Sequence, residues 1–337
     1  MKAVSVILCA RNAEATIDRA LDSIRAQTFQ DWELLVINDG STDATGDRIE
    51  QQAAIDGRIR PLHQEPLGIV PAFEHGRKQS TGRLIARMDA DDEMLPERLQ
   101  RQVDYLQQHP DIGLVSCKVH YGGDRTGQQG YARYVDWVNG LQTPEQIALR
   151  RFIESPIVNP AVCFRAELID QYGSYRDGDF PEDYELWLRW LDAGVRCYNL
   201  PVPLMRWNDL PSRQSRTNPR YRVEAFYKTK NQYLAKHLQR NFTPLPPIWL
   251  WGSGRVTRKR FADLKDLGIE FAGYVDVDPD KCGQIIDGLP VVFPEHLLAP
   301  GSAFVLAAVG SWSARERIQS WLDQHGWVEG RHYLLVA

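Results

Sequence analysis

Arg83-Leu-Ile-Ala-Arg-Met-Asp-Ala-Asp-Asp-Glu93 predicts a buried strand that ends in a cluster of carboxylates. The strand is the apolar run 84–88, and Asp89, Asp91 and Asp92 follow at its carboxyl end. Open α/β sheets bind their ligands at that end of their strands. Packed carboxylates repel one another unless a cation neutralises them, and their hard oxygens suit Mg²⁺ or Mn²⁺. The alternative is a solvated acidic turn before the next helix.

Strand and helix patterns alternate on both sides of this segment. Apolar runs at 4–8, 32–37 and 112–119 predict further strands, with helical patterns between them. This alternation predicts an α/β fold with a mostly parallel sheet and helices on both faces. The alternation of strand and helix patterns is less regular from 120 to 235. Within this stretch, residues 181–191 predict a helix with acidic residues in its first turn.

A second domain is expected after a proline-rich segment, residues 241–247, which predicts a stiff linker. The strand–helix alternation restarts there and predicts a small Rossmann-like α/β domain over residues 248–337. The larger domain would span residues 1–240, with one half at 1–115 and the other at 116–240.

The small domain carries part of a dinucleotide-binding fingerprint. Gly252 and Gly254 follow a predicted strand, and Asp276 stands where an acidic partner of a ribose would be expected. Thr257, however, replaces the third glycine, and a lone Gly-x-Gly is weak evidence. We therefore expect an accessory or assembly domain, through which the chain could form homo-oligomers, with cofactor binding as the alternative.

Composition and charge argue against several classes of protein. The 337 residues are 43% hydrophobic and 25% charged with a formal net charge of −4, which is unlike a disordered or a nucleic-acid-binding protein. No apolar run approaches the ~18 residues of a membrane span, and the N-terminus predicts a strand and not a signal peptide. Five scattered cysteines indicate reduced thiols, so we expect a cytoplasmic protein.

Polar residues follow three of the predicted strands, whose ends would meet in one crevice. Arg11 and Asn12 follow the first strand, Asp39 follows the second, and the acidic segment 89–92 follows the strand described above. Asp39 could accept a hydrogen bond from a base or a ribose, and a divalent ion at the cluster would bind a diphosphate. Taken alone, Asp39 fits turn chemistry and Arg11 fits a surface arginine. Together, these residues predict a nucleoside-diphosphate pocket.

Three of these segments closely resemble the nucleotide-sugar half of the family-two glycosyltransferases, inverting enzymes of the GT-A fold. They are 4–12, 35–43 and 85–92, and the resemblance covers roughly residues 1–235. It implies transfer of a sugar from a nucleoside-diphosphate-sugar to an acceptor hydroxyl, with Mg²⁺ or Mn²⁺ as the cofactor. The acceptor would be a saccharide or a lipid-linked saccharide, in the synthesis of a surface polysaccharide or another glycan.

The resemblance also implies roles for individual residues. Asp91 would hold the metal, Asp183 would be the catalytic base, and Glu182 would shape the acceptor site. The donor would be bound by Ala10, Arg11, Asn12, Asp39, Gly68, Asp89, Ala90 and Arg213. Cys9 departs from the family, since many members have proline there, and the loop after the first strand is expected to be less rigid.

An inverting transfer needs a base and a stabilised leaving group. The acceptor hydroxyl attacks the anomeric carbon from the face opposite the diphosphate, so a carboxylate must accept its proton. The metal stabilises the charge that develops on the leaving group. Glu182 and Asp183 could instead be favourable first-turn residues of their helix.

Residues 206–240 carry nine Lys or Arg side chains among aromatic residues. In related enzymes a segment here folds over the donor. The same residues could contact the anionic inner face of a membrane, at about 1 kcal/mol per basic residue, or form a solvated basic helix.

Two other functions compete with sugar transfer. A nucleotidyltransferase would need a Gly-rich basic loop that residues 9–14 lack, and a non-catalytic nucleotide-sugar-binding regulator would show no turnover.

Overall fold

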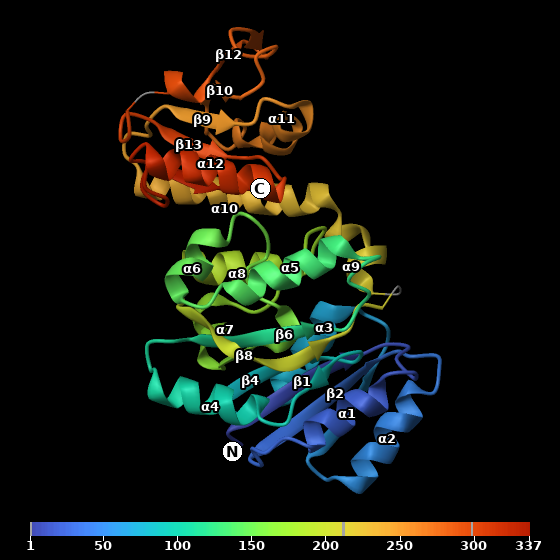
Figure 1. Cartoon of the computed structure of the whole chain (residues 1–337). Helices are drawn as coiled ribbons and strands as arrows, with labels where there is room; N and C mark the ends of the chain where they lie inside the picture. Colours follow the sequence, from blue (N-terminus) through green and yellow to red (C-terminus); the bar gives the residue numbers. More distant parts are fainter. Residues whose placement is uncertain (1, 211–212, 298) are drawn as a thin grey trace. The chain divides into compact units, whose positions relative to one another are not determined.

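Two sheets organise the chain, and the computed structural model describes residues 2–210, 213–297 and 299–337 (Figure 1). Contacts divide the chain into two compact units, each of which contains one sheet. The first unit comprises Met1–Ile147, Ile157–Gly178 and Arg189–Asn218, and the second comprises Ala148–Pro156, Asp179–Leu188 and Pro219–Ala337. The segment predicted as a linker, 241–247, lies inside the second unit, and the domain boundary there stays a prediction.

The first sheet is mostly parallel, which confirms the predicted fold class. Its order is β3-β2-β1-β4-β7-β6-β8-β5, in which β7 and β5 run antiparallel to their neighbours and the other pairs are parallel. Its strands are β1 (Val4–Ala10), β2 (Trp32–Asp39), β3 (Ile59–Gln64), β4 (Leu84–Asp89), β5 (Glu93–Met94), β6 (Leu114–Tyr121), β7 (Cys163–Arg165) and β8 (Cys197–Trp207).

Strand β4 is a continuous apolar run because it lies inside the sheet, between β1 and β7. A central strand covered on both faces has no solvent side, so its sequence does not alternate between apolar and polar residues. Residues 84–88 are all buried, including Arg87, the charged side chain in the run.

Helices cover both faces of the parallel part of this sheet. Helix α1 packs in one core with Val4 and Val6 of β1. Helix α3 packs on the opposite face, because a Cβ added at its Gly76 would lie 2.6 Å from Ile37 Cδ1 and 3.0 Å from Ile7 Cγ2. The helices of the chain are α1 (Ile17–Arg25), α2 (Thr45–Ile55), α3 (Ile69–Gln79), α4 (Arg98–Gln108), α5 (Gln129–Gly140), α6 (Pro144–Arg150), α7 (Glu167–Tyr172), α8 (Glu182–Asp192), α9 (Gln214–Thr217), α10 (Val223–Asn241), α11 (Arg255–Phe261) and α12 (Trp312–Gln324), with 3₁₀ turns η1 (Asn159–Ala161), η2 (Pro219–Tyr221), η3 (Ala262–Leu264) and η4 (Pro294–His296).

The second sheet has the Rossmann-like order predicted for the C-terminal region. Its order is β11-β12-β10-β9-β13-β14, and its pairs are parallel except for the edge pair of β11 with β12. Strand β9, the first in sequence, therefore lies between β10 and β13, as in a doubly wound sheet. Its strands are β9 (Ile248–Trp251), β10 (Phe271–Val275), β11 (Ile285–Ile286), β12 (Leu289–Val292), β13 (Phe304–Ala307) and β14 (Tyr333–Leu335).

The core of the second unit draws on segments far apart in the sequence. Phe152 and Tyr184 pack in one apolar cluster with Leu234 of α10 and with Leu250 of β9. The start of α8 is therefore held by the core around the second sheet. Among the described helices, none combines the length and hydrophobicity needed to cross a bilayer.

Candidate functional site

The acidic cluster predicted after β4 is present in the structure. Ligand oxygens of Asp89, Asp91 and Asp92 all lie within 4.8 Å of one another. Asp89 ends β4, Ala90 and Asp91 form a turn, and the chain folds back so that the Asp92 N–H donates to the Asp89 carbonyl at 3.3 Å. Asp92 is buried, whereas Asp89 and Asp91 are half-buried. The Asp-x-Asp pattern and the adjoining Asp92 thus bring three carboxylates together.

The electrostatics of this cluster fit a divalent cation. Burial and the charge of Asp89 raise the pKa of Asp91 to about 6. Burial and the charges of Asp91 and Asp89 raise the pKa of Asp92 well above its ordinary value. Asp92 Oδ1 accepts the Asn208 N–H at 2.8 Å, but Oδ2 is buried without a hydrogen-bond partner among the described residues. An orphaned buried oxygen beside two more carboxylates is a suitable donor set for Mg²⁺ or Mn²⁺.

A buried arginine that sequence reasoning missed lies next to the cluster. Arg87 is 1% exposed, and its Nη2 lies 3.2 Å from Asp89 Oδ1. Its guanidinium carbon lies 5.2 Å from the ring centre of Phe73 and 5.8 Å from that of Tyr175. A second buried arginine, Arg98, donates to the Arg87 carbonyl at 2.9 Å. A charged residue inside an apolar strand was the signal that could have revealed Arg87.

Cys9, which stands where many related enzymes have proline, also contacts this arginine. Its Sγ lies 3.7 Å from Arg87 Nη1. Burial raises the pKa of the Cys9 thiol to about 11, although Arg87 opposes that shift. A raised pKa keeps the thiol in its protonated form, whereas the thiolate is the reactive form of cysteine.

Asp39 and Gly68, both predicted to bind the donor, are bonded to each other. The Asp39 carboxylate is buried and accepts the N–H of Leu67 at 2.9 Å, the N–H of Gly68 at 2.9 Å and Gln64 Nε2 at 2.7 Å. Gly68 immediately precedes α3 and has a φ of 97°, a conformation that glycine adopts without strain. Asp39 therefore fixes the loop before α3, and its contact with a base stays a prediction.

The loop after β1 is tied to the loop after β2. Ala10 is the buried last residue of β1, and Arg11 is exposed. Asn12 has a φ of 50°, its N–H donates to Ser41 Oγ at 3.0 Å, and its Oδ1 accepts the Thr42 N–H at 2.9 Å. The predicted donor residues after β1 and β2 thus belong to one bonded pair of loops.

Arg213 lies close enough to the acidic cluster to affect its titration. Its charge opposes the rise in the pKa of both Asp91 and Asp92. Its guanidinium carbon lies 4.0 Å from the ring centre of Trp207, and Nη1 is buried without a hydrogen-bond partner among the described residues. The following Arg216 is paired with Asp209 at 2.7 Å. A cation is therefore held beside the carboxylates of the first unit.

Glu182 and Asp183 lie in the second unit, in the first turn of α8. Glu182 is buried, accepts the Tyr221 hydroxyl at 2.7 Å and lies 3.5 Å from Arg220 Nη1. Burial and the charge of Glu182 raise the pKa of Tyr221, which keeps this hydroxyl protonated as a donor. Asp183 is half-buried, and its Oδ1 accepts the Tyr184 N–H at 2.7 Å. The two acids are held differently, and their catalytic roles stay predictions.

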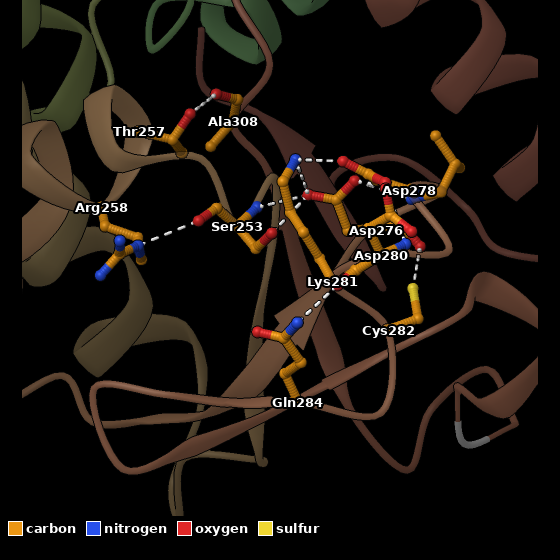
Figure 2. Close-up of polar contacts among 11 residues, drawn as sticks. Ser253, Thr257, Arg258, Asp276, Asp278, Asp280, Lys281, Cys282, Gln284 and Ala308 are labelled. Atoms are coloured by element: carbon orange, nitrogen blue, oxygen red, sulfur yellow. Dashed lines mark hydrogen bonds and ion pairs between the residues drawn. The ribbon is translucent and has the colours of Figure 1, made fainter.

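The fingerprint-like loop of the second sheet is closed by its own polar groups. Figure 2 shows Asp276 accepting the Ser253 N–H, at 3.1 Å, while Lys281 Nζ lies 3.6 Å from Asp276 and 3.0 Å from Asp278. The other oxygen of Asp276 accepts the Asp278 N–H at 3.1 Å. The carboxylate expected to meet a ribose is therefore engaged by its own loops.

Comparisons with known proteins show which sequences and folds this chain is similar to. Residues 5–173 match the family described as Glycosyl transferase family 2. The chain is 30% identical to the amylovoran biosynthesis glycosyltransferase AmsE of Erwinia amylovora, over 60% of this chain and 74% of AmsE. S. aureus TarS, solved in complex with UDP-GlcNAc, superposes with a TM-score of 0.54 at 19% identity, over 72% of this chain and 73% of TarS. The mannosyltransferase PcManGT from Pyrobaculum calidifontis, solved with GDP-Man and Mn²⁺, gives 0.51 at 18% identity, over 78% of this chain and 69% of that enzyme.

Proposed function

Because the chain belongs to glycosyl transferase family 2, we propose that it transfers a sugar from a nucleoside-diphosphate-sugar to an acceptor hydroxyl with inversion. The observation that carries this proposal is the cluster of Asp89, Asp91 and Asp92 at the carboxyl end of β4, with Arg213 beside it. Carboxylates that can hold a cation, next to a fixed guanidinium, are suited to a diphosphate.

The metal site would be formed by Asp91 together with Asp89 and Asp92, and would hold Mg²⁺ or Mn²⁺. When bound, the cation would stabilise negative charge on the departing diphosphate. Arg213 would bind the same diphosphate, because its Nη1 is buried without a partner among the described residues. PcManGT, whose structure contains both GDP-Man and Mn²⁺, supports this arrangement by analogy of fold.

The donor nucleoside would be bound by the loops after β1 and β2 and by the loop before α3. The bond between Asp39 and Gly68 joins the loop after β2 to the loop before α3. The bond between Asn12 and Thr42 joins the loop after β1 to the loop after β2. Such bonds hold the backbone in place before a ligand arrives, which reduces the entropy that binding must overcome. Arg11, exposed at the same edge, would contact the nucleotide through its side chain or backbone.

The catalytic base would be Asp183, which would accept the proton of the acceptor hydroxyl. Glu182 would shape the acceptor site. Support comes from their position in the first turn of α8 and from their burial, since Glu182 is buried and Asp183 is half-buried. A general base has to reach the acceptor hydroxyl, so the more exposed acid is the better candidate.

The acceptor would be a saccharide or a lipid-linked saccharide in polysaccharide synthesis. AmsE, named for amylovoran biosynthesis, supports this class of product. The exposed basic residues of the segment 206–240, such as Arg222, Lys228 and Lys236, would favour contact with the anionic inner face of a membrane, where a lipid-linked acceptor would be presented.

A thermal-shift screen would test the donor and the metal together. The full chain is heated with UDP, GDP, dTDP and CMP sugars, with Mn²⁺ and with EDTA. We expect one nucleotide to raise the melting temperature in a Mn²⁺-dependent way, and Asp91→Ala to remove that dependence. If Asp91→Ala keeps both the shift and turnover of the donor, the assignment of the metal site is wrong.

A further inference from the structure

A groove of about 550 Å³ lies in the second unit, between α11 and the face of the second sheet formed by β9, β10 and β12. Its apolar side chains are Leu250, Ala262, Ile269, Phe271, Tyr274 and Leu289. Two of them are aromatic; Tyr274 is buried and Phe271 is half-buried, so Phe271 offers the flat surface on which a planar ring can pack. Its volume lies within the range of small-molecule sites, about 300–1,000 Å³.

Four cationic side chains line this groove, and only one of them forms an ion pair with the described residues. Arg258 lies against Asp287 in an ion pair and donates from Nε to the Ser253 carbonyl at 2.9 Å, a bond that Figure 2 shows. Arg255, Lys259 and Lys265 are exposed and form no ion pair with the described residues. One cation is thus a fixed part of the wall, and three can meet a ligand.

Three like charges around one groove repel one another and attract an anion. Phosphate is the anion that Lys and Arg bind best, because its oxygens accept several charge-assisted hydrogen bonds. The apolar side chains would then pack against the part of the ligand attached to the phosphate. The groove therefore favours a phosphate ester with a ring over a bare inorganic ion.

We infer that this groove binds a soluble phosphate ester of nucleotide size. Glu270 and Asp287 also line it. Asp287 is paired with Arg258, but Glu270 is exposed and forms no ion pair with the described residues. Its carboxylate would repel the uniformly anionic surface of a bilayer, whereas a nucleotide carries ribose hydroxyls and amino groups that can donate to it. The charge pattern thus favours a nucleotide over a lipid headgroup.

This site is separate from the donor site of the proposed function. All residues that line it belong to the second unit, and the acidic cluster that would hold the metal belongs to the first. It is also separate from the fingerprint loop, where Asp276 is engaged by Ser253 and Lys281. Binding in the groove should therefore need no divalent cation.

Calorimetric titration of the full chain in EDTA tests this inference, with UDP, GDP, ATP and pyrophosphate as probes. We expect saturable binding of at least one nucleotide, one per chain, with pyrophosphate weaker. The triple variant Arg255→Gln/Lys259→Gln/Lys265→Gln should weaken that binding at least about tenfold, because three charge-assisted contacts are lost. The same triple variant should keep the Mn²⁺-dependent thermal shift with the donor, which separates this outcome from a failure of the donor site.

A matched control has the same change of charge elsewhere in the second unit. Lys236, Arg317 and Arg331 are exposed and do not line the groove, and their triple replacement by Gln should leave binding unchanged. Urea unfolding checks that both variants fold. The inference is overturned if no nucleotide binds in EDTA or if both triple variants lose binding equally. A flotation assay with phosphatidylglycerol vesicles tests the lipid alternative. The inference also fails if the groove variant no longer floats with these vesicles but still binds nucleotides as the wild type does.

Discussion

At the level of single residues, the acidic cluster is explained by its neighbours as much as by its own sequence. Arg87 is buried, and its ion pair with Asp89 gives this half-buried carboxylate a fixed countercharge. The three aspartates could be predicted because they are adjacent in sequence. Arg87 was missed because its role depends on Phe73 and Tyr175, which reach it from other segments.

Replacing Arg87 by Met should destabilise the protein by about 3 kcal/mol, because Asp89 loses the buried partner of its ion pair. Urea unfolding at pH 7.5 measures this change. Arg83→Met is the matched control, since Arg83 is exposed one residue before β4 and should change stability by less than about 0.5 kcal/mol. Equal stability of the two variants would contradict the role given to Arg87.

Binding of Mn²⁺ should depend on pH through Asp91. The folded-state pKa of Asp91 is raised to about 6, so its contribution to stability is present at low pH and is lost as the pH rises through about 6. A cation at the cluster compensates for that loss, because it favours the ionised form. We therefore expect Mn²⁺ to raise the melting temperature more at pH 7.5 than at pH 5, and we expect Asp91→Asn to respond equally weakly at both values. A Mn²⁺ effect that is larger at pH 5 would refute this explanation.

At the level of elements, the strands with long apolar segments were predictable, whereas the short central strand β7, the strand β8 and the loops were not. Strands β1, β2 and β4 are mostly apolar runs, since burial on both faces leaves a nearly continuous signal. The bonds between Asp39 and the 67–68 backbone join segments 28 and 29 residues apart. No local pattern encodes such a pairing, so the sequence suggested only a turn or a ligand contact for Asp39.

Gly68→Ala should destabilise the protein by about 1–2 kcal/mol because its φ of 97° is strained for alanine. Gly130 in α5 is the matched control, since a Cβ added at either glycine meets nothing within 4 Å and only Gly68 has a left-handed φ. Gly130→Ala should be neutral or stabilising by up to about 1 kcal/mol. Urea unfolding midpoints compare the two, and an equal effect would rule out backbone strain at Gly68.

At the level of the whole molecule, the two sheets were predictable, but the segments that complete the second core were not. The Rossmann-like alternation after residue 248 is a local pattern, and so is the proline-rich segment before it. The second unit also includes residues 148–156 and 179–188. Their membership rests on contacts of Phe152 and Tyr184 with α10 and the second sheet, which sequence periodicity does not report.

Ending the chain at residue 240 should therefore expose apolar surface. Leu234 and Leu238 of α10 share a core with Ile248 and Leu250, which such a fragment lacks. We expect the fragment to bind a hydrophobic dye and to be cleaved within α10 by trypsin much faster than the full chain. A fragment as resistant as the full chain would show that residues 1–240 form an independent domain.

The central claim, inverting sugar transfer with Asp183 as the base, is tested most directly by following the anomeric proton of the product by NMR. With the preferred nucleotide-sugar, Mn²⁺ and an acceptor, the wild type should form a product of the opposite anomeric configuration. Asp183→Asn should be slower by at least about a hundredfold while it still binds the donor. A product that retains the donor's configuration, or an Asp183→Asn variant as fast as the wild type, would contradict it.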